Sequence, residues 1–387
     1  MTKARDTANI IKQPFTQTLG TSNYRAGVNA GNSIQSGGNY NVVVGDEAGT
    51  AITTGDNNVG IGSNSLASNT TGTQNTAVGA FTLDSNTTAD GNTAVGGSAL
   101  GQNTTGASNT ALGRSALTAN TTGASNTAVG KDSLLANTTG NINTAVGLSA
   151  LATNTEGLNN SALGVNALNA NTTGDDNVAI GYQALLLNTT ANNNTAVGNG
   201  SLKVNTTGAD NTAFGKSALA ANTTAANNSA FGATSLDANT TGTQNNAFGT
   251  NALTANTTAS YNAAFGTSSL AANTTGASNS AFGASTLAAN TTASNNTAMG
   301  YNAGTAITTG TENTVVGALA GDAITTGNEN TAVGKTALSA DTKGHRSVAI
   351  GQGTLATQNF TSSTNSYNTA VGFQAGNAVT TGTLNTF

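Results

Sequence analysis

The chain contains no cysteine, no tryptophan and a single proline, and few of its side chains are charged or aromatic. Charged residues make up 7% of its 387 positions, whereas ordinary globular domains contain about 25%. The lack of cysteine excludes a disulfide framework and thiol chemistry. The net charge is −5, without any basic block, and no apolar run has the length of a membrane span. We therefore expect neither nucleic acid nor a membrane among its partners.

Glycine, asparagine, threonine and alanine are abundant instead, and they form a repeat. The glycine that closes each Asn-Thr-Ala-Val-Gly motif (the repeat glycine) recurs every seventeen residues from Gly45 to Gly351, and Gly372 follows four residues late. Gly, Asn and Thr are poor helix formers, and a strict short period means that each unit contacts only its neighbours. The sequence predicts an all-β, parallel β-solenoid (β-roll) of 17-residue coils, stacked about 4.8 Å apart.

Each coil is expected to hold two short strands, around Asn-Thr-Ala-Val and around Ala-Leu, joined by Gly/Asn corners. The predicted solenoid covers residues 28–387, and its last repeat is incomplete because the chain ends at Asn385-Thr386-Phe387. Residues 1–27 lie outside the repeat and lack the apolar core of a secretory signal.

Apolar ladders indicate which positions are buried. Leucine recurs at one position from Leu66 to Leu287, and the position before the repeat glycine is always apolar. Because side chains alternate along a strand, Ala94 and Val95 point to opposite faces. A strand that is apolar on both faces needs a second partner surface, which favours an oligomer. The predicted interface ladder includes Val95, Val129, Phe214, Phe231, Phe248, Phe265, Phe282 and Met299.

Four coils depart from the consensus in the same way, with AGTAITTG or a close variant. In each, glycine replaces the ladder leucine, and Ile or Val replaces the Asn of Asn-Thr-Thr three residues later, as at Gly49 and Ile52. The simplest interpretation is that both positions reach one core pocket, so that the interior volume is nearly conserved. The Asn position is then expected to lie at a corner near the interior.

The Thr-Ala-Val-Gly motifs, with Val348–Gly351 among them, resemble the repeat motif in the head domains of YadA-like trimeric adhesins. The resemblance implies a homotrimer of β-rolls, with Ala94 and its equivalents lining each roll and Val95 or Phe214 equivalents at the threefold interface. The long NTAVG…ALxxNTTG arrays also resemble those of bacteriophage tail fibres, and residues 2–11 are similar to the N-termini of such phage proteins.

These resemblances imply a structural virion fibre, made in the host cytoplasm, that spaces or presents host-binding surfaces. The N-terminal segment, with Lys3, Arg5 and Lys12, would attach it to other virion proteins, and a host surface glycan or protein would be a further partner. One alternative is a bacterial cell-surface trimeric adhesin, which a signal peptide or a membrane anchor would favour. Another is a monomeric solenoid that binds ice or glycans.

Nothing in the sequence predicts an enzyme, a cofactor or a metal site. His345 is the only histidine, so a catalytic triad or metal cluster would rest on one residue, and we expect it in an exposed loop. The Asn-Thr-Thr repeats match the glycosylation sequon. In the variant coils, however, Ile or Val replaces the asparagine, which favours a structural role for it as part of a stacked Asn ladder. The candidate recognition loop is the insertion at residues 356–368, with Phe360 and Tyr367.

Overall fold

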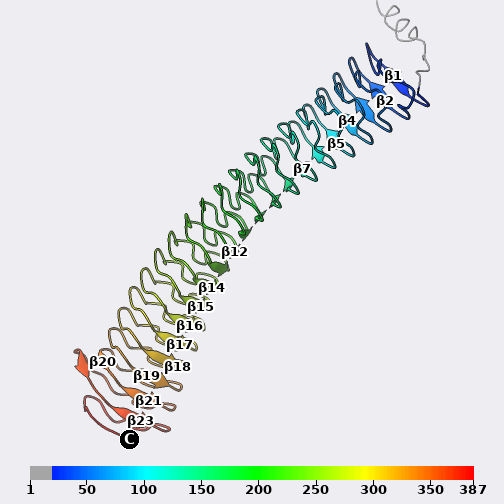
Figure 1. Ribbon diagram of the computed structural model, residues 1–387. Helices are drawn as coiled ribbons and strands as arrows, with labels where there is room; N and C mark the ends of the chain where they lie inside the picture. Colours follow the sequence, from blue (N-terminus) through cyan, green and yellow to red (C-terminus); the bar gives the residue numbers. More distant parts are fainter. Residues whose placement is uncertain (1–19) are drawn as a thin grey trace, which may run out of the picture. The chain divides into compact units, whose positions relative to one another are not determined.

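The computed structural model describes residues 20–387, which form two compact units, one ending at Asp176 and the other comprising Asn177–Phe387. Each unit is a stack of coils, and one short strand per coil contributes to a parallel sheet (Figure 1). No helix occurs within residues 20–387. The all-β, parallel β-solenoid expected from the repeat is confirmed in both units.

The strands recur at the same place in successive coils. Those described up to residue 176 are β1 (Tyr24–Ala26), β2 (Val42–Val44), β3 (Val59–Ile61), β4 (Thr76–Val78), β5 (Thr93–Val95), β6 (Thr110–Leu112), β7 (Thr127–Val129), β8 (Thr144–Val146) and β9 (Ser161–Leu163). Those of the second unit are β10 (Val178–Ile180), β11 (Thr195–Val197), β12 (Thr212–Phe214), β13 (Ser229–Phe231), β14 (Asn246–Phe248), β15 (Ala263–Phe265), β16 (Ser280–Phe282), β17 (Thr297–Met299), β18 (Thr314–Val316), β19 (Thr331–Val333), β20 (Gly344–His345), β21 (Val348–Ile350), β22 (Thr364–Asn365) and β23 (Thr369–Val371).

The pairing register confirms the 17-residue coil. Between β4 and β5, Ala77 lies opposite Ala94 and Val78 opposite Val95, so identical repeat positions stack directly on one another. The separation is 17 residues for the pairs from β2 to β9 and from β10 to β19 and on to β21. It is 18 between β1 and β2 and 21 between β21 and β23. The four inserted residues are therefore looped out without disturbing the sheet.

From β2 onward, the middle residue of each three-residue strand faces the interior of its coil. Ala94 is fully buried, as are its alanine equivalents along both units, and Leu66, Leu83 and the later ladder leucines are fully buried as well. Thr93 is half-buried and Val95 is exposed. The predicted alternation is confirmed, with alanine inside and the residue before the repeat glycine outside.

The Ala-Leu segment is not a strand, contrary to the expectation of two strands per coil. Its residues Ala99 and Leu100 are adjacent, yet both are fully buried, whereas adjacent side chains of a strand point to opposite faces. Leu100 instead adopts a left-handed turn conformation, with a φ of 50°. Its N–H donates to the carbonyl of Ala116 in the next coil at 3.0 Å, while the N–H of Asn103 donates back to Leu100 at 3.2 Å. A chain of turns thus places consecutive side chains in the core.

The repeat glycines occupy a backbone conformation that other residues rarely adopt. Gly130, for example, has a φ of 128°, and a Cβ added there would lie 2.6 Å from the carbonyl oxygen of Gly147 in the next coil. Both the φ value and the close approach of neighbouring coils require glycine. This explains why the position is glycine in every repeat.

The Asn of Asn-Thr-Thr is fully buried and forms the expected stack, which we name the corner Asn ladder. Asn86 Nδ2 donates to Asn69 Oδ1 at 2.8 Å, and Asn103 Nδ2 donates to Asn86 Oδ1 at 2.9 Å. Asn86 Nδ2 also donates to the carbonyl of Ala89 at the same corner, at 3.1 Å. A second buried ladder is formed by the Asn preceding each strand, as where Asn92 Oδ1 accepts from the N–H of Asn109 at 2.9 Å.

The AGTAITTG variant is confirmed as an alternative packing of one core pocket. A Cβ added to Gly49 would lie 2.8 Å from Ile52 Cδ1, and Ile52 is fully buried. The same Cβ would lie 2.6 Å from Cγ1 of Val43, which replaces the usual strand alanine in this coil. Gly321 stands in the same relation to Ile324 and Val315. In these two coils valine at the strand position supplies part of the volume that leucine loses, whereas the coil of Gly304 keeps alanine, Ala298, at that position.

The first described coil begins before the predicted boundary at residue 28. β1 pairs in parallel with β2, so the solenoid includes residues that the sequence assigned to the N-terminal segment. Arg25, within β1, donates from Nη1 to the carbonyl of Gly31 at 2.6 Å. Gly31 and Ile34 form a further copy of the glycine–isoleucine pair, since a Cβ on Gly31 would lie 2.9 Å from Ile34 Cδ1. The remainder of the predicted attachment segment, with Lys3, Arg5 and Lys12, lies outside the described residues.

Candidate functional site

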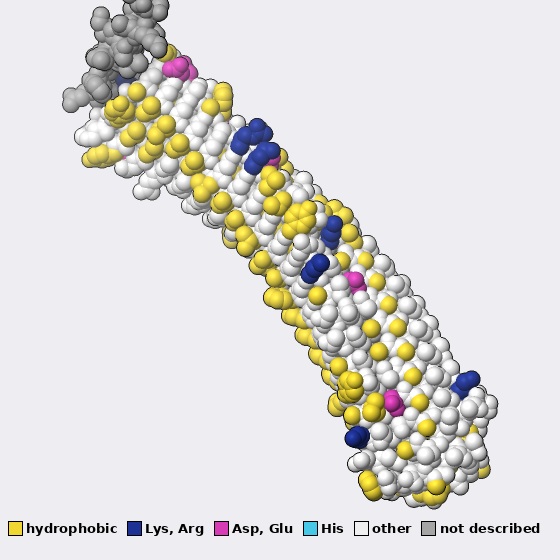
Figure 2. Space-filling model, turned by 180° about the vertical axis from the view of Figure 1, so that it is seen from behind, with side chains coloured by type: hydrophobic (Ala, Val, Ile, Leu, Met, Phe, Trp, Pro, Cys, Tyr) yellow, Lys and Arg dark blue, Asp and Glu magenta, His cyan; other side chains and the backbone are white. Residues whose placement is uncertain are grey.

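The residue before each repeat glycine forms an outward apolar ladder on the strand face, which we name the outward ladder. Val95 is 39% exposed, Phe214 52% and Met299 50%, whereas Val129 is half-buried by its neighbours. In Figure 2 hydrophobic side chains, drawn in yellow, follow the edge of each unit on which Figure 1 places the strands. Every position of this ladder from β2 to β23, the two-residue strands aside, carries an apolar side chain.

In the second unit the outward ladder becomes an aromatic stack. The ring centroids of Phe231 and Phe248 are 4.6 Å apart, those of Phe248 and Phe265 4.7 Å, and those of Phe265 and Phe282 4.8 Å. Phe214 stands at 6.1 Å from Phe231. The rings are nearly parallel, with interplanar angles of 8° or less among the last four. The coil spacing imposes this geometry, which leaves the edges of the rings uncovered within the single chain.

The insertion at residues 356–368 displays only one of its two aromatic side chains. Phe360 is 5% exposed, so the expectation that it is available for recognition is wrong, whereas Tyr367 is 48% exposed. The Phe360 N–H donates to Oδ1 of the buried Asp341 at 3.1 Å, and its carbonyl accepts from the N–H of Lys343 at 3.0 Å. Because Asp341 and Lys343 both belong to the preceding coil, these bonds hold the start of the insertion against that coil.

Tyr367 belongs to a surface chain of contacts across three coils. Arg346 Nη1 donates to the Tyr367 hydroxyl at 2.9 Å, and its guanidinium lies 5.6 Å from the ring centroid. Arg346 also forms an ion pair with Glu329, Nε to Oε2 at 3.0 Å. The hydrogen bond from Arg346 lowers the pKa of Glu329, and the one to Glu329 raises the pKa of Arg346. Because Arg346 already bonds both Glu329 and Tyr367, this chain of contacts links neighbouring coils at the surface rather than forming an open binding site.

His345 is half-buried in β20 rather than exposed in a loop, so that expectation is wrong. Its Nδ1 accepts a hydrogen bond from the N–H of Asn328 at 2.9 Å, and its Nε2 lies 2.8 Å from the hydroxyl oxygen of Ser363. The inserted residues supply β22, which pairs with β20. The histidine therefore ties the insertion to the preceding coil.

Three other kinds of site come into question within residues 20–387: a metal site, a membrane-spanning helix and a glycosylation site. No group of three or more His, Cys, Asp or Glu side chains is placed to hold a metal ion in this part of the chain. The described residues also include no helix that is long and apolar enough to cross a membrane. The sequon asparagines, such as Asn69 and Asn120, are fully buried, which makes them inaccessible to glycosylation in the folded chain.

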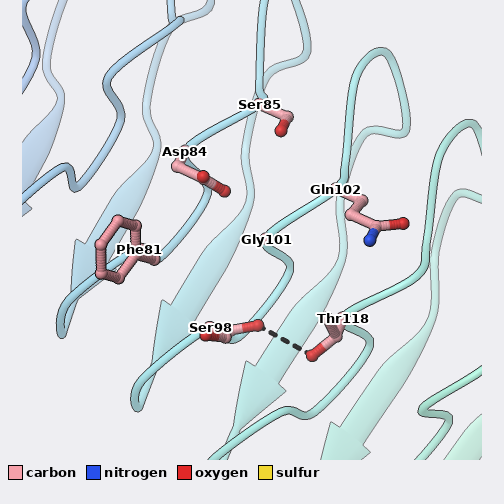
Figure 3. Close-up of a pocket in the computed structure, with 7 residues that line it drawn as sticks. All are labelled: Phe81, Asp84, Ser85, Ser98, Gly101, Gln102 and Thr118. Carbon is pink, nitrogen blue, oxygen red and sulfur yellow. Dashed lines mark hydrogen bonds between the residues drawn. The ribbon is translucent and has the colours of Figure 1, made fainter.

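Sequence reasoning missed a pocket of about 190 Å³ in the first unit. It is lined by Phe81, Asp84, Ser85, Ser98, Gly101, Gln102 and Thr118, from three successive coils. Figure 3 shows Phe81 and Asp84 on one side, Gln102 and Thr118 on the other, and Gly101 between them. The available signal was that Phe81 and Gly101 are unusual residues for their repeat positions.

No family model and no curated protein sequence matches this chain.

Proposed function

We propose that the chain forms the shaft of a homotrimeric virion fibre of the phage tail-fibre type. Three solenoids would pack their outward ladders around a common axis, and the shaft would space or present host-binding surfaces without catalysis. The N-terminal segment with Lys3, Arg5 and Lys12 would join it to other virion proteins. The fibre would belong to the virion, after synthesis in the host cytoplasm.

The observation that carries this proposal is the exposure of the outward ladder in a single chain. Soluble monomers rarely expose contiguous apolar patches beyond a few hundred Å². Phe214, Phe231 and Phe282 are 36–52% exposed, and covering them would remove roughly 70–100 Å² of each ring from water. At about 25 cal/mol per Å², this burial contributes about 2 kcal/mol per ring and per chain.

The composition of the ladder supports self-association in particular. Every ladder side chain is Val, Ile, Leu, Phe or Met, so the ladder itself contributes no unpaired charge to an interface, where such a charge would be costly. The ladder follows the sheet with one apolar side chain per coil, and identical copies can therefore match it position by position. Interfaces between identical subunits are typically richer in apolar surface than the remaining surface.

Ice binding by a monomer receives less support. A flat array of outward threonines would be needed, yet the two threonines of each corner differ. Thr70 is half-buried, and its hydroxyl donates to the carbonyl of Thr87 at 3.0 Å, while Thr71 is exposed. Only one of the two hydroxyl rows is therefore free to order water.

Light scattering of the full chain in solution tests the trimer. We expect a mass three times the 37.6 kDa of the single chain. Phe248→Glu places a carboxylate from each copy in the interface and is expected to yield monomers. The matched control is Tyr261→Glu, which changes an exposed aromatic outside the ladder and should leave the mass unchanged. A monomeric wild-type chain would overturn the proposal.

A further inference from the structure

We propose that the pocket around Phe81 binds a single pyranose ring of a glycan. All seven lining residues belong to one chain, and none lies in a strand or on the outward ladder. The inference therefore goes beyond the proposed fibre, and it does not depend on the oligomeric state.

The pocket exists because several departures from the repeat coincide. Phe81 is 49% exposed and occupies a position that holds Asn64 and Ser98 in the neighbouring coils. Gly101 occupies a position that holds Asp84 and Thr118 on either side. An aromatic wall and a missing side chain thus meet at one place on the surface.

Gly101 is not required by its backbone conformation. It does not share the positive φ of the repeat glycines, and Thr118 occupies the equivalent place in the next coil without a positive φ. A Cβ on Gly101 would lie 3.4 Å from Asp84 Oδ1 and 3.3 Å from the Ser98 carbonyl oxygen. Any larger side chain would project into the pocket beside the carboxylate. Glycine at this position therefore places no side-chain atom in the pocket.

The Thr118 hydroxyl donates to the Ser98 carbonyl at 2.9 Å within the pocket, whereas Asp84 and Gln102 remain available to a ligand. Burial raises the pKa of the Asp84 carboxyl, although backbone N–H groups of Asp84 and Ser85 partly offset it. Within residues 20–387, the ion pairs are Lys131–Asp132 and Arg346–Glu329, so no cation pairs with Asp84 there. In the same part of the chain the carboxamide of Gln102 makes no hydrogen bond to protein.

These groups match the chemistry of a sugar. A pyranose ring has a face of C–H groups, which packs on an aromatic ring, and a rim of hydroxyls that both donate and accept hydrogen bonds. Phe81 supplies the aromatic surface, Asp84 supplies acceptors, and Gln102 and the two serines supply both donors and acceptors. A cation would need acceptors alone. The volume of about 190 Å³ lies below the 300–1,000 Å³ typical of larger ligands and suits one ring.

Saturation-transfer NMR with the full chain and free glucose, galactose, mannose and N-acetylglucosamine tests this site. We expect at least one sugar to bind, with a dissociation constant on the order of 1 mM. Phe81→Ser and Gly101→Thr copy residues from neighbouring coils and should fold. Each should reduce the transferred signal at least tenfold. The matched control Tyr261→Ser removes an aromatic that is 62% exposed elsewhere and should retain the signal.

Three results would overturn the inference: no sugar binds, binding survives both pocket substitutions, or n-butylamine binds through Phe81 while the sugars do not. Circular dichroism of each variant confirms that the solenoid is retained. The outcome is separable from that of the fibre proposal. A monomeric chain that binds sugar through Phe81 would refute the fibre and support this site, and a trimer that binds no sugar would do the reverse.

Discussion

Transplanting the glycine–isoleucine pair into an ordinary coil tests whether the two positions share one core pocket. The coil with Leu134 and Asn137 is suitable, since both side chains are fully buried. Leu134→Gly and Asn137→Ile, made singly and together, convert it to the arrangement seen at Gly304 and Ile307, where the strand residue, Ala298, is alanine like Ala128 in this coil. We expect each single change to destabilise the chain, and the pair to cost less than the sum of the two single changes.

The magnitudes follow from the packing. Removing the Leu134 side chain costs about 3–5 kcal/mol in burial and cavity terms. Relief of its left-handed conformation, with a φ of 47°, offsets about 1–2 kcal/mol of this. Asn137→Ile alone overpacks the pocket by about 1–3 kcal/mol. It also removes the bonds from Asn137 Nδ2 to Asn120 Oδ1 and to the Gly140 carbonyl, at about 1 kcal/mol each.

The double variant should recover about half of the summed loss. The new Ile side chain would fill the space left by Leu134, and burial of such a side chain contributes about 1.5–3 kcal/mol. Overpacking also disappears, so we expect a coupling free energy of about 3 kcal/mol between the two changes. Asn154 would lose Asn137 as a partner but would keep the Gly157 carbonyl at 3.1 Å. Asn69 ends the corner Asn ladder in this way above Ile52.

The assay is a double-mutant cycle, with the free energy of unfolding of each variant measured in denaturant by circular dichroism. All variants are measured at the same protein concentration, because association would shift the unfolding midpoints. The control cycle pairs Leu134→Gly with Asn205→Ile, which lies in the other unit. It should be additive within about 0.5 kcal/mol. Additivity in the Leu134–Asn137 cycle as well would refute the shared pocket.

Two further predictions concern the corners of the coils. Gly130→Ala should cost about 3–5 kcal/mol in the free energy of unfolding, because of its φ and its contact with Gly147. The control Gly101→Ala should cost less than about 1 kcal/mol, and equal costs would contradict the conformational argument. The pKa of Glu329 is lowered in the folded chain, so its bond to Arg346 stabilises the fold at neutral pH and is lost as the pH falls below the ordinary value of 4.5. Hydrogen exchange of residues 344–347, corrected for intrinsic rates, should accelerate in acid in the wild type and should not depend on pH in Glu329→Gln.

Much of the fold could be predicted because the same residue types recur at the same positions of each coil. The spacing of the repeat glycines sets the register, and the recurrence of alanine and leucine at the positions of Ala94 and Leu66 identifies the interior. Because Ile52 takes the place of the asparagine in one coil, the sequence predicts that the corner Asn ladder lies near the interior, and its asparagines are fully buried. Such positions are predictable because burial restricts the residue type at every copy.

The rest depends on details that no single position carries. Leu100 recurs as an apolar residue where a buried strand was expected, but its burial beside Ala99 requires a turn with positive φ, a conformation that leucine rarely adopts. Phe360 was expected on a displayed loop because it lies in an insertion, yet hydrogen bonds from its backbone draw it inward. The pocket at Phe81 is lined by residues of three coils, and these residues become neighbours only when the coils are stacked in the 17-residue register.

The identity of successive coils also has a consequence for how such a gene can change. Every strand from β2 to β9 meets its neighbour at a separation of 17 residues. Unequal recombination that deletes or duplicates one repeat unit would therefore join two coils that already fit. A change of any other length must be accommodated as a loop, as with the four extra residues before β23. The length of the stack can thus vary in whole coils between related genes while its surface chemistry is inherited unit by unit.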